Sequence, residues 1–175
     1  MTVLPGNVVA SYEKVIVLPS SDHIKELHTV LRDKNTDRSE FVFCADRLMR
    51  LVIEEGLNQL PFSAVQITTP TGCEYDGIAF THGNCGVSIC RSGEVMEHAL
   101  RMCCRSIRTG LTVCKAANVL IQNGVAEENI ILLSVFSTPN SIKYIRKNYA
   151  NMTVITSEMN ANVPHSFTTR YFGTD

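Results

Sequence analysis

The second half of this sequence alternates between apolar, strand-like runs and stretches with helical spacing, and that alternation limits the fold more than any other feature. Residues 85–90 form a continuous apolar run, of the length expected for a strand buried on both faces, and helical spacing follows over residues 95–102. The same order recurs as helix, strand, helix and strand, predicted over residues 111–122, 129–136, 139–149 and 152–156. Such alternation predicts an α/β fold with a doubly wound parallel sheet.

The first half predicts two amphipathic helices and a small hairpin. Apolar residues at helical spacing favour one helix over residues 20–31 and a second that has Ser39 as its N-cap and ends near Gly56. The buried side of the second helix is expected to carry Phe43, Leu48, Leu51 and Val52. Over residues 64–80, β-branched residues around a Pro/Gly break are typical of two short strands and a turn.

Length, charge and hydropathy restrict the class of protein. With 175 residues, of which 45% are hydrophobic, the chain can bury one sizeable core, and we expect a single domain over residues 1–175. A net charge of −1 with no basic run argues against nucleic-acid and membrane-surface binding, so we expect small molecules or a second copy as partners. Residues 1–17 lack a signal-peptide pattern and no stretch approaches transmembrane length. Residues 160–175 show no period and are expected to form an ordered loop and terminus.

The seven cysteines indicate a reducing compartment rather than a disulfide framework. We therefore expect a cytoplasmic location, with the nucleus as a second compartment. Five of the thiols lie in apolar runs, where cysteine behaves as a small hydrophobe: Cys85, Cys90, Cys103, Cys104 and Cys114. A zinc site is disfavoured because the chain has no C-x-x-C pair and Cys103 and Cys104 are adjacent. We expect no protein-bound metal.

Ligands of open parallel sheets bind beyond the carboxyl ends of the strands, which points to residues 91–94, residues 137–140 and the stretch after Thr156. In the second of these segments, the Ser-Thr-Pro sequence is best explained as a helix cap. None of the five histidines stands in nucleophilic order with a serine or cysteine, and most are expected at the surface. His165, in the irregular C-terminal stretch, is the one histidine that we keep as a functional candidate. No catalytic nucleophile is predicted.

Two short segments have the chemistry of phosphate binding. Gly93 lets the backbone approach a phosphate closely, and Arg91 can donate a forked pair of hydrogen bonds to it. The alternative is a turn arginine that pairs with Glu94 or Glu97. Residues 109–112 precede a predicted helix, whose first amides could cradle an anion.

Taken together, these segments resemble the uracil phosphoribosyltransferase family. The resemblance is carried by residues 31–34 with Arg38, 43–51, 54–61, 68–72, 84–89, 91–94, 103–108 and 170–175. It implies the type I phosphoribosyltransferase fold, with a small hairpin region and a sheet that lacks one strand.

The resemblance also implies an activity and its residues. Family members are glycosyltransferases of pyrimidine salvage, which transfer the phosphoribosyl group of phosphoribosyl diphosphate, with Mg²⁺, onto uracil to make UMP. Arg91, in the segment Arg-Ser-Gly-Glu, matches the arginine that holds the diphosphate. The phosphoribosyl diphosphate loop is matched by Thr109, Gly110, Leu111 and Thr112, and the uracil loop by His165, Ser166 and Phe167.

Regulation and assembly are implied in the same way. Some eukaryotic relatives are activated by GTP, so nucleotide binding extends beyond the substrate, and family members commonly form homo-oligomers. The positions that match the GTP site are Arg38, Arg47, Thr81, His82, Gly83, Asn84 and Arg108.

Two departures from the family pattern leave two interpretations open. After Arg108 the sequence runs directly into the Thr-Gly pair at 109–110, without the strand, flap and acidic loop that family members carry there. Residues 163–167 are shorter than the uracil loop of active members and lack its glycines and aspartate. The chain is then either a uracil phosphoribosyltransferase or a non-catalytic homologue that keeps the fold for nucleotide or partner binding.

Overall fold

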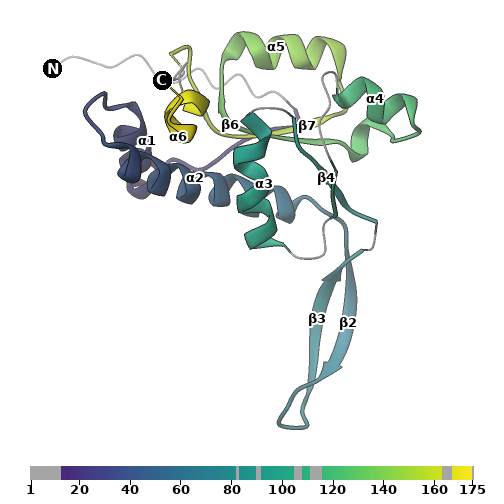
Figure 1. Ribbon diagram of the computed structural model, residues 1–175. Helices are drawn as coiled ribbons and strands as arrows, with labels where there is room; N and C mark the ends of the chain where they lie inside the picture. Colours follow the sequence, from purple (N-terminus) through teal and green to yellow (C-terminus); the bar gives the residue numbers. More distant parts are fainter. Residues whose placement is uncertain are drawn as a thin grey trace, which may run out of the picture.

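The structure, a computed structural model, describes residues 13–81, 83–89, 92–104, 108–110, 116–162 and 167–174 (Figure 1). The helices are α1 (Asp22–Arg32), α2 (Arg38–Asn58), α3 (Ser92–Cys103), α4 (Ala116–Gln122), α5 (Pro139–Asn148) and α6 (Phe167–Phe172), with a 3₁₀ turn at Glu127–Asn129. The strands are β1 (Val15–Val17), β2 (Phe62–Thr68), β3 (Glu74–Phe80), β4 (Cys85–Val87), β5 (Arg108–Gly110), β6 (Ile131–Ser137) and β7 (Thr153–Met159). No helix of the described residues is long and apolar enough to span a membrane.

A three-stranded parallel sheet in the order β1-β7-β6 forms the centre of the fold. Figure 1 shows α5 over one face of this sheet and α2 over the other. Neighbouring residues of β7 serve the two faces, because side chains alternate along a strand. Val154 packs in a cluster with Ile142 of α5, whereas Ile155 packs in the larger cluster with α2, and all three side chains are fully buried. The predicted doubly wound α/β fold is confirmed.

The other strands form two separate pairs. β4 and β5 are parallel to each other, and within the described residues no strand pairing joins them to β6. This arrangement agrees with a sheet that lacks one strand. β2 and β3 form the predicted hairpin, which extends away from the layered body (Figure 1).

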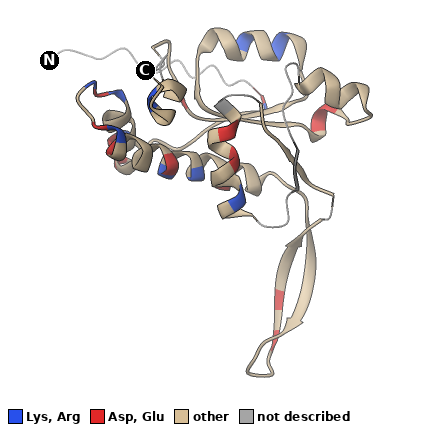
Figure 2. Cartoon of the chain, viewed as in Figure 1, with Lys and Arg blue, Asp and Glu red and all other residues tan. Residues whose placement is uncertain are grey.

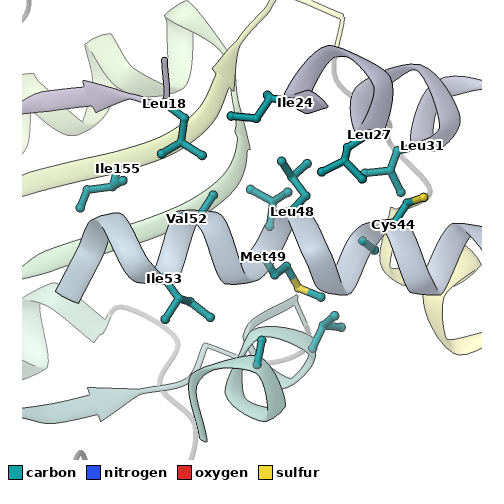
Figure 3. Close-up of a cluster of buried hydrophobic side chains, with 14 of the residues drawn as sticks. Leu18, Ile24, Leu27, Leu31, Cys44, Leu48, Met49, Val52, Ile53 and Ile155 are labelled. Carbon is teal, nitrogen blue, oxygen red and sulfur yellow. The ribbon is translucent and has the colours of Figure 1, made fainter. Parts of the chain in front are cut away.

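Helix α2 supplies most of the core. Asp37 caps its first turn by accepting a hydrogen bond from the Glu40 amide at 3.0 Å. In Figure 3, Leu48 and Val52 point towards the sheet, where Ile155 lies, and Met49 lies on the opposite side, towards α3. The helix is thus buried on two sides, between the sheet with α1 and the helix α3.

Four details of the secondary structure differ from the sequence prediction. The cap of α2 is Asp37, not Ser39, and Phe43 lies on the solvent side, 62% exposed. The run over 85–90 forms a strand only at Cys85–Val87, and its side chains are partly exposed rather than buried on both faces. Helix α3 begins at Ser92, earlier than predicted, whereas residues 111–115 of the predicted helix 111–122 lie outside the described residues.

Both ends of the described chain hold elements that the periodicity did not predict. The short strand β1 pairs with β7, and α6 stands where a loop was predicted. The six residues of α6 include two threonines, which are weak helix formers. The helix is instead held by packing, because Phe167 and Tyr171, four residues apart, lie on one side of it and pack against the core.

Candidate functional site

The parallel pair β4 and β5 provides the edge at which phosphate chemistry is expected. Cys85 pairs with Arg108 and Val87 with Gly110, so the two carboxyl ends lie next to each other. Thr109 and Gly110, predicted as part of a loop, are therefore strand residues of β5. Arg91, Leu111 and Thr112 lie outside the described residues. In sequence, Arg91 follows the end of β4 and Leu111 directly follows the end of β5.

Gly93 has a structural role, beside which its predicted approach to a phosphate stays a prediction. A Cβ atom at this position would lie 2.9 Å from Ser88 Oγ and 3.2 Å from the Ser88 carbonyl carbon. The Gly93 amide donates to the Ile89 carbonyl at 2.7 Å. Glycine is therefore needed for the tight passage from β4 into α3.

Only one residue of the predicted uracil loop is described. Phe167 begins α6, with its ring centroid 5.4 Å from that of Phe41 and 5.5 Å from that of Phe136. Its ring is partly buried and joins the helix to α2 and β6. His165 and Ser166 lie outside the described residues.

The residues matched to a GTP site are spread along α2 and beyond it. Arg38 Nη2 donates to the Tyr171 carbonyl at 3.2 Å, whereas Arg47 Nη2 lies 3.0 Å from His23 Nε2 and over the ring of Phe43. At about 1.5 Å of helix per residue, Arg38 and Arg47 are separated by roughly 14 Å along the axis.

The remaining GTP positions lie past the other end of α2. The Thr81 amide donates to the Pro61 carbonyl at 2.9 Å, and Asn84 Nδ2 donates to the Thr81 carbonyl at 3.0 Å, which fixes the turn that contains Gly83. His82 lies outside the described residues, and Arg108 is described only as a strand residue of β5. Within one chain the turn stands apart from Arg38, at the opposite end of the helix.

The end of β7, which runs to Met159 rather than stopping at Thr156 as predicted, does gather polar side chains. Glu158 Oε2 pairs with Arg32 Nη2 and lies 3.5 Å from Nδ1 of His28. Asn160 Nδ2 donates to the other carboxylate oxygen at 3.1 Å. The sequence pointed to this strand end but not to His28, which was expected at the surface and is buried.

The same cluster shifts two pKa values. Burial lowers the pKa of His28, as does the charge of Arg32, whereas the Glu158 carboxylate opposes them. Burial alone would raise the pKa of Glu158, but hydrogen bonds from Asn160 and Arg32 and the charges of His28 and Arg32 hold it below its ordinary value. One sequence signal was available, since His28 and Arg32 are four residues apart on one helix and so share a face.

The thiols lack the features of a nucleophile. Burial and the neighbouring Glu54 carboxylate raise the pKa of Cys103 to about 11, so this thiol stays protonated at neutral pH. Cys104 is buried as well, in agreement with its predicted packing role. In the described part of the chain, no three His, Cys, Asp or Glu side chains gather in a way that could hold a metal ion.

Comparison with known proteins identifies the family. The profile described as uracil phosphoribosyltransferase matches residues 17–110 and 106–172. A uracil phosphoribosyltransferase homolog of Danio rerio is 46% identical over 91% of this chain and 77% of its own length. The Homo sapiens homolog is 44% identical over 91% of this chain, which spans 64% of that relative. The uracil phosphoribosyltransferase of Dictyostelium discoideum is 36% identical over 93% of this chain and 98% of its own length.

The alignments also locate the missing segment. The match to the Danio rerio homolog extends over 198 positions, more than the 175 residues of this chain, and the two parts of the family profile meet at residues 106–110. Among solved structures, the AQ2163 protein of Aquifex aeolicus has a TM-score of 0.69 over 90% of this chain and 97% of its own. At 10% identity, that likeness shows the fold alone. On its sequence matches, this chain belongs to the uracil phosphoribosyltransferase family.

Proposed function

We propose that this chain binds phosphoribosyl diphosphate at the carboxyl edge of β4 and β5 and transfers its phosphoribosyl group to uracil, giving UMP and diphosphate. The observation that carries the proposal is the parallel pairing of the two strands, which end side by side at Val87 and Gly110. The segments that follow them in sequence contain Arg91 and Thr112, which match the family's phosphate-binding positions. Ligands of parallel sheets bind at this kind of edge.

The proposed chemistry needs charge stabilisation rather than a nucleophile. The bond from the ribose carbon to diphosphate breaks while a bond to a uracil nitrogen forms, and that nitrogen gives up its proton to water. Negative charge therefore grows on the leaving diphosphate. We assign Arg91 to that charge, because a guanidinium forks onto two phosphate oxygens. Mg²⁺ would neutralise further charge on the same group. We assign the ion to the diphosphate.

One observation favours a second candidate, a non-catalytic homologue that binds a nucleotide or a partner. Phe167, which the resemblance assigns to the uracil loop, packs against Phe41 and Phe136 instead of presenting a free ring. The alignments place a missing segment at residues 106–110, next to the proposed phosphate edge. In this second candidate the chain still binds at the phosphate site but does not catalyse the transfer.

Calorimetric titration with phosphoribosyl diphosphate and Mg²⁺, followed by a UMP assay, tests both candidates. We expect Arg91→Ala to weaken binding by about 10–100-fold, the loss that follows from removing a charged hydrogen bond. Arg101→Ala is the matched control, because it removes the same charge from the far end of α3, where Arg101 pairs with Glu97 at 2.7 Å. UMP formation supports the enzyme, and binding without UMP supports the second candidate. Equal binding by both variants contradicts the phosphate site.

We further propose that the chain forms homo-oligomers through the β2–β3 hairpin. A two-stranded hairpin is marginally stable alone in water. Ile67 and Tyr75 stand opposite each other and are more than half exposed, and Ile78 lies exposed on the other face. A second copy would cover both faces. Because the positions matched to a GTP site lie at both ends of α2 within one chain, we propose that any activation by GTP requires the oligomer.

Tyr75→Glu is expected to shift the chain towards the monomer, because burying a carboxylate in an apolar contact is costly. Sedimentation velocity across a concentration series measures the shift, which we expect to raise the dissociation constant by at least about tenfold. Tyr144→Glu serves as the control, since that tyrosine is also exposed and belongs to α5, the helix on the opposite side of the molecule from the hairpin (Figure 1 and Figure 2). Equal dissociation in both variants would contradict a hairpin interface.

A reducing location, in the cytoplasm or the nucleus, is part of the same proposal. None of the cysteines with a described state forms a disulfide: Cys44, Cys73, Cys85, Cys103 and Cys104. Cysteines that stay reduced are typical of compartments that keep glutathione reduced.

A further inference from the structure

His28 is a buried titratable group that the proposed reaction does not use. It lies in α1 and is only 9% exposed, and within the described residues neither ring nitrogen has a partner at good hydrogen-bond geometry, although the Ser157 backbone and the Glu158 carboxylate lie close to the ring. Its ring meets that of Phe136 at a centroid distance of 5.5 Å, in an edge-on arrangement. Buried polar groups without partners are uncommon, so this ring requires an explanation.

Two basic side chains approach the same carboxylate oxygen. His28 Nδ1 lies 3.5 Å from Glu158 Oε2, and Arg32 Nη2 pairs with that same atom. Arg32 Nη1 also donates to the Asn162 carbonyl at 2.6 Å. One guanidinium therefore connects α1 to Glu158 and to the segment beyond it.

Burial, rather than the surrounding charges, favours the neutral form of His28. The Glu158 carboxylate and the Ser157 backbone, both from β7, raise the pKa of His28, Arg32 of its own helix lowers it, and β6 presents the uncharged ring of Phe136. Burial lowers the pKa of His28 more than the Glu158 carboxylate raises it. Because its pKa is lowered, the ring is neutral at neutral pH and takes up its proton only below the ordinary pKa of histidine, 6.5.

We propose that His28, Arg32 and Glu158 form a pH-operated latch between α1 and the carboxyl end of β7. At neutral pH the imidazole is uncharged, and Glu158 forms its ion pair with Arg32. In acid, a proton from solvent makes His28 a second cation beside a single carboxylate. The buried imidazolium cannot reach water, so it forms the ion pair with Glu158. The side chain of Arg32, which is longer and 29% exposed, then turns towards solvent and no longer donates to the Asn162 carbonyl.

None of the latch residues belongs to the proposed phosphate site. The effect of the latch is to loosen the segment that follows β7 at acidic pH. In that segment Asn160 donates its amide to the Ser137 carbonyl at 2.9 Å, and Asn162 donates its amide to the Asn160 side chain at 2.9 Å. Both amides report on whether the segment is held.

Amide hydrogen exchange, corrected for the intrinsic pH dependence of exchange, tests the latch in the whole chain. Uptake of one proton shifts a linked equilibrium by at most about tenfold per pH unit, so we expect protection at Asn160 and Asn162 to fall by up to about tenfold from pH 6 to pH 5. His28→Gln should abolish the fall, whereas His98→Gln, which alters an exposed histidine of α3, should retain it. A fall of the same size in His28→Gln, or no fall in the unmodified chain, would overturn the proposal.

A second variant opens the latch from the other side. Arg32→Gln removes the cation that holds Glu158 and Asn162 at neutral pH. We expect low protection at Asn162 in this variant across the whole pH range. Protection that is normal at pH 7 and falls in acid, as in the unmodified chain, would show that Arg32 does not hold the segment and would contradict the latch.

Discussion

Replacing Phe41 by alanine is expected to lower the free energy of unfolding by about 4 kcal/mol, within the usual range for a buried aromatic residue. Phe41 is 1% exposed, and its ring lies 5.4 Å from that of Phe167 and 4.8 Å from the guanidinium carbon of Arg170. Truncation leaves a cavity where α2 meets α6 and removes the surface on which α6 packs. Urea unfolding followed by circular dichroism measures the loss.

Phe43, two residues further along the same helix, is the matched control. Its side chain is 62% exposed and its described ring contact is with the guanidinium of Arg47, at 5.4 Å. We expect Phe43→Ala to change the free energy of unfolding by less than about 1 kcal/mol, the scale of an exposed cation–π contact. Losses of similar size in Phe41→Ala and Phe43→Ala would contradict the burial pattern of α2.

Periodicity was sufficient to predict the layered part of this fold. β6, α5 and β7 carry strong local patterns because each is covered on at least one side by a single continuous core. The burial of β7 on both faces leaves no polar alternation, which is the signature of a strand inside a parallel sheet. Elements of this kind can be predicted from local sequence, because the same pattern of buried and exposed positions repeats along the whole element.

Elements held by distant contacts did not follow from local sequence. β1 is three residues long and exists by pairing with β7, and α6 is held by its packing on α2. Phe43 has the spacing of a core residue, but α2 is buried by the sheet, α1 and α3 rather than on its Phe43 side. Which face of a helix is covered depends on tertiary structure, and spacing alone leaves that choice open.

The candidate site was predictable in part for the same reason. The rule that ligands bind at the carboxyl ends of parallel strands identified the edge of β4 and β5, whose adjacency the structure shows. It did not identify His28, because the partner Glu158 is 130 residues away in sequence and only the fold brings them together. Gly93 shows what residue type alone leaves out: a glycine after a strand suggested an approach to a phosphate, but its close contact with Ser88 could not be predicted from the sequence.

Arg170→Ala is expected to cost about 2–3 kcal/mol of unfolding free energy, because one guanidinium serves several backbone carbonyls. Nη1 donates to the Asp33 carbonyl at 2.9 Å, and Nη2 donates to the carbonyls of Thr36 and, at 3.4 Å, Lys34. These carbonyls belong to the link between α1 and α2, so Arg170 fastens the C-terminal helix across it. We expect Arg170→Lys to recover less than half of the loss, since an ammonium lacks the planar fork. Full recovery by lysine would mean that charge alone matters.

Phe41 and Arg170 act on the same junction, and a double-mutant cycle separates their shared contribution from their separate ones. The guanidinium lies over the Phe41 ring, so the loss in the double variant should be smaller than the sum of the two single losses by about 1 kcal/mol. Strict additivity would show that the ring and the guanidinium stabilise the junction independently. Arg170 lies in the C-terminal segment 170–175, which is among the runs that carry the family resemblance. Coupling of the expected size would therefore give one residue of that segment a structural role, with no ligand required.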